Sequence, residues 1–174
     1  MPFITDRELR SFAPSYIQNE SRTYIKASAS AAAVTVFLSH SHEDKDLIAS
    51  FLEFLARQRV YVYVDWLDSK MPRETSPETA RLVKERIGQC RKFIMLATNK
   101  AVSSRWVPWE LGVADTKKTL ANIAIFPVKP DYGKWIGNEY IGIYSSISKA
   151  DSGEWAVFEA GKTQGCTLKY WLQN

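Results

Sequence analysis

Four short, almost continuously apolar runs recur along the chain, and the segments between them carry helical signals. The runs are Val34–Leu38, Val60–Val64, Lys92–Ala97 and Ile123–Val128. Strands this apolar are typical of a sheet that is covered on both faces, because parallel strands are joined by helical crossovers. Tyr140–Tyr144 is expected to add a fifth, short strand near an edge. The pattern predicts an α/β fold built on a five-stranded parallel sheet with helices on both faces.

The intervening segments have the spacing and the boundaries of helices. Leu47, Phe51 and Leu55 form an apolar stripe, and Ser76-Pro77 opens a helix that is expected to run to about Gln89. Further helices are expected at Thr5–Phe12 and, as a closing element, at Glu154–Ala160. Strands that alternate with helices in this way predict the flavodoxin-like strand order 2-1-3-4-5.

Composition limits both the domain organisation and the partners. The 174 residues are 45% hydrophobic and 24% charged, which fits one globular domain; we assign it residues 33–174, with residues 1–32 as a helical extension packing on it. A net charge of +4 without a basic and aromatic run gives no indication of nucleic-acid binding. The N-terminus does not resemble a signal peptide, and Ala27–Val36 is too short to span a bilayer. Two cysteines, Cys90 and Cys166, fit free thiols, so we expect a cytoplasmic protein that does not enter membranes.

Three polar loops follow the first three predicted strands, and parallel strands bring them to one edge of the sheet. The loops are Ser39–Asp44, Asp65–Ser76 and Asn99–Glu110. None contains a glycine-rich phosphate loop, and no serine elbow or cysteine–histidine pair stands out. His40 and His42 lie two residues apart, but the sequence presents no third ligand, so no metal site is predicted.

The last of these loops leads into a helix that carries one carboxylate among aromatic rings. Ser103 or Ser104 can cap this helix, and Pro108 is tolerated only in its first turn. Glu110 then falls in the opening turns, between Trp106 and Trp109. A lone carboxylate shielded by indole rings at a strand-to-helix edge is the best candidate for chemistry in the chain.

Three motifs together resemble the Toll/interleukin-1 receptor (TIR) domain. Val36–Ser41, leading into an amphipathic helix, is similar to box 1, and Val64-Asp65-Trp66 with the loop through Met71-Pro72 resembles the BB loop in its bacterial form. Ser104–Leu111 is similar to the S-x-W-x-x-x-E segment of TIR domains that consume NAD⁺. The resemblance covers roughly Val34–Val128 and implies the flavodoxin-like TIR fold.

The resemblance implies that Glu110 is essential for breaking the bond between nicotinamide and ribose, with NAD⁺ as the substrate and no cofactor. His40 and Ser41 would line the phosphate side, where some relatives carry an arginine. The alternative for Asp65 is that it braces its own loop, and at least one of the two tryptophans is expected to serve core packing only. The residues that the resemblance places against the substrate are Ser39, His40, Ser41, Asp65, Trp66 and Trp106.

Two functions compete on this basis. The first is an NAD⁺-consuming enzyme that releases ADP-ribose or a cyclic or linked product; the second is a non-catalytic module that assembles with other TIR domains. An enzyme acting on free nucleosides is a more distant third. The resemblance further implies self-association through the BB loop. Small TIR proteins of bacterial antiviral systems such as Thoeris suggest a product that activates a separate effector.

Overall fold

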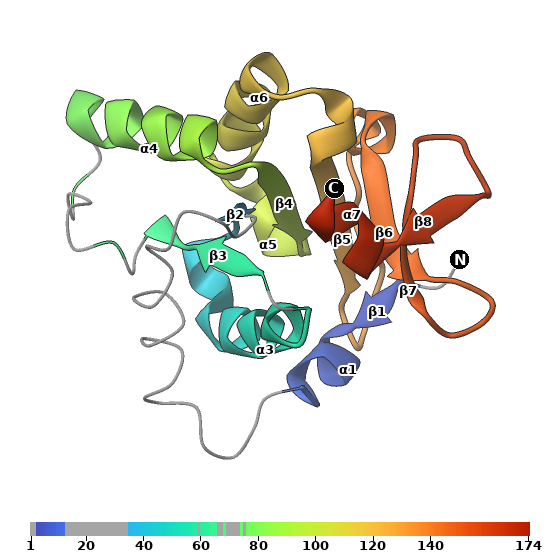
Figure 1. Cartoon of the computed structure of the whole chain (residues 1–174). Helices are drawn as coiled ribbons and strands as arrows, with labels where there is room; N and C mark the ends of the chain where they lie inside the picture. Colours follow the sequence, from blue (N-terminus) through green and yellow to red (C-terminus); the bar gives the residue numbers. More distant parts are fainter. Residues whose placement is uncertain (1–2, 13–34, 59, 66–67, 69–73, 75) are drawn as a thin grey trace.

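An eight-stranded sheet organises the chain in the computed structural model, with the order β3-β2-β4-β5-β6-β7-β8 and β1 paired to β5 (Figure 1). The model describes residues 3–12, 35–58, 60–65, 68, 74 and 76–174. The strands are β1 Ile4–Thr5, β2 Thr35–Ser39, β3 Tyr61–Tyr63, β4 Lys92–Ala97, β5 Ile123–Lys129, β6 Ser145–Lys149, β7 Trp155–Phe158 and β8 Gly165–Thr167.

The predicted parallel order is confirmed. The pairs β3-β2, β2-β4, β4-β5 and β5-β6 are all parallel, which is the order 2-1-3-4-5 when these five strands are numbered along the chain. Two further strands, β7 and β8, extend the sheet in antiparallel fashion beyond β6. In the register of the central strands, Ser39 at the end of β2 lies opposite Met95 of β4.

Helices cover both faces, as predicted. Figure 1 shows α1 and α3 on one side of the sheet and α4 and α6 on the other. Successive residues of β2 face opposite layers: Val36 and Leu38 pack with the α3 side, and Phe37 packs with the α4 and α6 side. The helices and short 3₁₀ segments are α1 Asp6–Arg10, η2 His42–Asp44, α3 Lys45–Ala56, α4 Pro77–Gln89, α5 Asn99–Ser103, α6 Val107–Lys117, η4 Leu120–Asn122, η5 Glu139–Ile143 and α7 Leu168–Gln173.

Two elements near the C-terminus differ from the prediction. The fifth parallel strand is Ser145–Lys149, whereas Tyr140–Tyr144 mostly forms the 3₁₀ segment η5. The strand was missed because three of its five residues are serines, two of them buried, so it has no apolar run.

The closing helix predicted at Glu154–Ala160 is wrong, because β7 occupies Trp155–Phe158. The turn before it contains Gly153 with φ +83°, a conformation that glycine adopts without strain, and this turn reverses the chain into a β6–β7 hairpin. Four residues rich in aromatic and branched side chains then pair antiparallel to β6.

The N-terminal segment joins the domain through both a strand and a helix. Thr5 caps α1 through a reciprocal capping box with Glu8, so the predicted helix at Thr5–Phe12 is confirmed. Leu9 is 0% exposed and lies in the same core cluster as the apolar residues of α3. Residues 13–34 lie outside the described part, so the domain boundary near residue 32 stays a prediction. Within the described residues, no helix combines the length and apolar character needed to cross a bilayer.

Substitution of Leu9 tests whether α1 belongs to the cooperative fold. Leu9→Ala is expected to lower the free energy of unfolding by about 2–5 kcal/mol, because it leaves a cavity against α3. Urea denaturation followed by circular dichroism measures this. Arg7→Ala on the exposed face of α1 is the control and should lie within about 0.5 kcal/mol of wild type. If Leu9→Ala behaves like the control, α1 unfolds independently of the sheet.

Candidate active site

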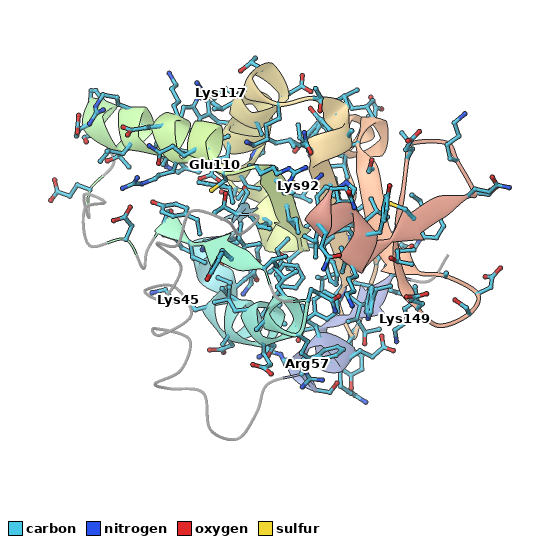
Figure 2. The ribbon with its side chains drawn as sticks, in the orientation of Figure 1. Lys45, Arg57, Lys92, Glu110, Lys117 and Lys149 are labelled. Carbon is cyan, nitrogen blue, oxygen red and sulfur yellow. The ribbon has the colours of Figure 1, made fainter. Side chains whose placement is uncertain are left out.

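Glu110 lies in the first turn of α6, close to where this helix meets β2 and β4 (Figure 2). The Ser104 hydroxyl oxygen accepts hydrogen bonds from the backbone N–H groups of Trp106 and Val107, at 3.2 and 3.4 Å, as predicted for a serine before this helix. The N-cap residue itself is Trp106, whose side chain makes no capping hydrogen bond. Pro108 occupies the first turn, where its missing N–H costs nothing. These local features start α6 at Val107, and Glu110 in its first turn then lies beside the sheet.

The Glu110 carboxyl group is buried and contacts the end of β2. Its residue is 5% exposed, and the Ser39 hydroxyl donates a hydrogen bond of 2.5 Å to Glu110 Oε2. Burial raises the pKa of Glu110 to about 8; the Ser39 hydrogen bond works against this rise, and the negative charge of Asp65 adds to it. The Glu110 carboxyl group is therefore mostly neutral at pH 7, and it ionises as the pH rises through about 8.

Asp65, just beyond β3, brings two histidines together beside this carboxyl group. The imidazole Nε2 of His42 lies 3.3 Å from Asp65 Oδ2, and that of His40 lies 3.7 Å from Asp65 Oδ1. The pKa of His40 is lowered because the ring is buried, although Asp65 opposes this. The pKa of His42 is raised by its hydrogen bond to Asp65.

Asp65 thus provides a candidate third ligand that the sequence did not present. One ligand atom from each of His40, His42 and Asp65 lies within 4.8 Å of the other two. The prediction that no metal binds was based on two histidines alone, and that reason does not hold in the folded chain. Asp65 was predicted to face the substrate, but its nearness to His42 was not visible, because it depends on how β2 and β3 are aligned.

The two tryptophans beside Glu110 have different environments. Their rings make an edge-to-face contact with centroids 5.0 Å apart. Trp109 packs against the core cluster of α4 and α6, and the Lys84 ammonium lies over its ring. Trp106 is half-buried at the start of α6. Trp109 therefore serves packing, as was expected of one of the pair, and the substrate contact predicted for Trp106 stays a prediction.

For two of the predicted substrate-binding residues, Ser41 and Trp66, the structure gives no evidence of a place in the site. Ser41 is buried, and its hydroxyl oxygen accepts the backbone N–H of Glu43, so it caps the 3₁₀ segment η2. Trp66 lies outside the described residues, as does most of the loop through Met71-Pro72. The role predicted for this side chain stays a prediction.

A second buried carboxyl group lies at the same edge and was not singled out from the sequence. Asp44 accepts a hydrogen bond from the hydroxyl of Thr98, the residue that follows β4 and caps α5. Burial raises the pKa of Asp44, and the Thr98 hydrogen bond and the nearby Lys100 lower it. The sequence signal that could have pointed to this polar pair is the position of Thr98 directly after an apolar strand.

The chain is similar to known proteins over most of its length. The sequence model of the TIR domain family matches residues 36–158, which reaches past the motifs to include β6 and β7. A protein of Bacillus cereus (strain MSX-D12), named probable 3′ cyclic ADP-D-ribose synthase ThsB′, is 32% identical over 147 residues, covering 80% of this chain and 75% of that protein.

A second relative, from Cytobacillus dafuensis, is provisionally named cyclic ADP-D-ribose synthase TIR2. It is 26% identical over 116 residues, which cover 58% of this chain and 31% of that longer protein. The family match spans more than half of the chain, and it includes β2, Asp65 and the helix of Glu110. The chain belongs to the TIR domain family.

Proposed function

We propose that this chain cleaves the bond between nicotinamide and ribose in NAD⁺, as an NAD⁺ glycohydrolase or ADP-ribosyl cyclase, with Glu110 as the catalytic residue. The observation that carries the proposal is a buried carboxyl group held by Ser39 at the carboxyl edge of a parallel sheet. Among the described residues, Glu110 forms no ion pair with a lysine, arginine or histidine, so its ionised form is not already paired with a basic side chain. The names of the two relatives support the same chemistry.

The reaction suits a site with a single carboxylate. Nicotinamide in NAD⁺ is already a cationic pyridinium, so it leaves as a neutral molecule and needs no general acid. Positive charge then develops on the ribose, as in other oxocarbenium-like transition states. A carboxylate in a dry pocket stabilises that charge far more than it could in water, and it can also orient the ribose through its hydroxyls.

We assign each of the surrounding residues to a different part of NAD⁺. Trp106 offers a half-buried indole face beside Glu110 for the nicotinamide ring. Asp65 can accept hydrogen bonds from ribose hydroxyls, while Ser39 positions the catalytic carboxylate. We assign His40 to the phosphate side of the pocket, with Ser41 acting through the turn that it caps. Trp66 completes the proposed set as a stacking surface.

The product and its setting follow from the relatives. Both bear the name of a cyclic ADP-D-ribose synthase, which supports an intramolecular attack on the ribose cation in place of water. Such a product suits a signal that is read by a separate effector in antiviral defence. Both cysteines are free thiols, which fits our placement of the protein in the cytoplasm, where NAD⁺ is available.

Replacement of Glu110 tests its catalytic role. Glu110→Ala and Glu110→Gln are expected to lower the rate of nicotinamide release by at least about 100-fold, because the charge that stabilises the ribose cation is lost. Concentrated protein is incubated with NAD⁺, and the products are resolved by chromatography. Glu154→Gln, at an exposed turn remote from the site, is the matched control and should retain full activity.

Equal nicotinamide release by wild type and both Glu110 variants would remove Glu110 from this role. No release from any of the proteins, including assembled wild type, would favour the non-catalytic module that assembles with other TIR domains. Circular dichroism establishes that the variants are folded.

The raised pKa of Glu110 predicts a dependence of kcat/KM on pH. Burial places this pKa at about 8, and only the ionised form can stabilise a cation, so kcat/KM should rise with pH with its midpoint near pH 8, and level off only above about pH 9. Once NAD⁺ is bound, the cationic nicotinamide favours the carboxylate, so the midpoint for kcat should lie at lower pH. Initial rates from about pH 5 to pH 9 measure both. A kcat/KM that is flat or falls over this range contradicts the assignment.

Self-association is expected to control activity. Glu110 is only 5% exposed, so the ribose reaches it only when the site opens, and TIR–TIR contacts are the proposed means of holding it open. Specific activity should therefore rise with protein concentration, in step with the assembled fraction measured by light scattering. A specific activity independent of concentration would show that the monomer is sufficient.

A further inference from the structure

His40, His42 and Asp65 form a cluster whose ligand atoms converge from two loops. His40 and His42 follow β2, and Asp65 follows β3, so the cluster joins neighbouring parallel strands at their carboxyl ends. The closest approaches between the imidazole Nε2 atoms and the carboxylate are 3.3 and 3.7 Å, and the two rings lie with their centroids 5.8 Å apart. The same nitrogen, Nε2, points inward from each ring.

The environment of His40 leaves that nitrogen without a suitable partner. Its Nδ1 lies 3.1 Å from the backbone oxygen of Leu38, and a carbonyl oxygen only accepts, so Nδ1 must carry the hydrogen. The side chain is 2% exposed, and Nε2 has no hydrogen-bond partner among the described residues. In the uncharged ring, Nε2 therefore presents a lone pair toward the oxygens of Asp65. Two electron-rich groups face each other across 3.7 Å.

A cation between these groups would resolve the conflict, and we propose that His40, His42 and Asp65 bind a divalent transition-metal ion such as Zn²⁺. Two imidazoles and one carboxylate are a common zinc ligand set, with a fourth position left for water or a ligand. The hydrogen bond from His40 Nδ1 to a backbone carbonyl is the support that metal-bound histidines usually have.

Binding a metal ion requires only a small movement of the three ligand atoms, and the exposed His42 side chain can make it. Ligand atoms around tetrahedral zinc lie roughly 3.3–3.5 Å apart, given bond lengths of about 2.0–2.2 Å. The three atoms already lie within 4.8 Å of one another. The His42 side chain is 69% exposed, so it can turn toward the ion without disturbing the core, while His40 stays fixed.

Metal occupancy has a consequence that rests on the proposed function. His40 and Asp65 are two of the residues assigned to NAD⁺, whereas His42 is not. A bound ion would engage the first two, so Zn²⁺ and NAD⁺ should compete for the pocket. The site would then inhibit the enzyme and take no part in the reaction itself.

Zinc titration against a chromophoric chelator, without NAD⁺, tests the site directly. Wild type is expected to bind one Zn²⁺ per chain at this cluster, and His42→Ala and Asp65→Asn should each bind it at least about tenfold more weakly. Cys166→Ser removes a half-exposed thiol outside the cluster and is the matched control, which should bind as wild type does. Unchanged affinity in both cluster variants, or no binding by wild type, would overturn the proposal.

Nitrogen chemical shifts give a second readout, because the chain has only two histidines. Zinc should shift the Nε2 resonance of both rings in a long-range ¹H–¹⁵N spectrum, while His40 Nδ1 stays protonated. Zinc binding that shifts neither Nε2 places the ion elsewhere and refutes the assignment.

Activity assays then examine the competition. Zinc should slow NAD⁺ cleavage by wild type but not by His42→Ala, which keeps full activity without metal. Equal inhibition of both proteins would refute the competition. If neither protein cleaves NAD⁺, the proposed function fails, and the titration and the spectra still decide the metal site.

Discussion

The hydrogen bond from Ser39 to Glu110 joins the two structural elements on which the site depends. It ties the last residue of β2 to the first turn of α6, across 71 positions of sequence. Burying a carboxyl group is unfavourable unless it is neutral or hydrogen-bonded, and here the single hydroxyl only partly offsets the loss of water. The stability of the rest of the fold has to offset the unfavourable burial of this carboxyl group. Such a fixed, poorly solvated charge is what a preorganised catalytic group requires.

The parallel topology explains why so many polar groups gather at one edge. Strands β2, β3 and β4 run in the same direction, so the residues after them, Ser39 with His40, then Asp65, then Thr98, all emerge at their carboxyl ends. Right-handed crossovers through helices place the chain back at the opposite edge each time. A sheet whose central strands β2, β4 and β5 are mostly apolar can therefore concentrate polar side chains where the next helix starts.

The sequence was sufficient for the features that depend on local pattern. Apolar runs located β2, β4 and β5, proline and serine located the starts of α4 and α6, and the strand order followed from alternation with helices. The serine-rich β6 and the hairpin that makes Trp155–Phe158 a strand lack such a pattern, because pairing with neighbours decides them. The nearness of Asp65 to His42 depends on strand alignment, which no local signal carries. Glu110 could be identified from the sequence as the candidate catalytic residue, but its hydrogen bond to Ser39 could not be predicted.

One electrostatic property connects the two proposals. Glu110, Asp65 and Asp44 lie at the same edge, and burial raises the pKa values of Glu110 and Asp44 because charge is poorly solvated there. Among the described residues, Glu110 forms no ion pair with a basic side chain, Asp44 lies 3.9 Å from the Lys100 ammonium, and Asp65 lies beside the two histidines. Carboxyl groups gathered in this way favour a cationic ligand. In our proposals, the cationic pyridinium of NAD⁺ is this ligand during the reaction, and a metal ion is this ligand when no NAD⁺ is bound. On our proposals, the carboxyl groups that favour the substrate's positive charge also favour a competing metal ion.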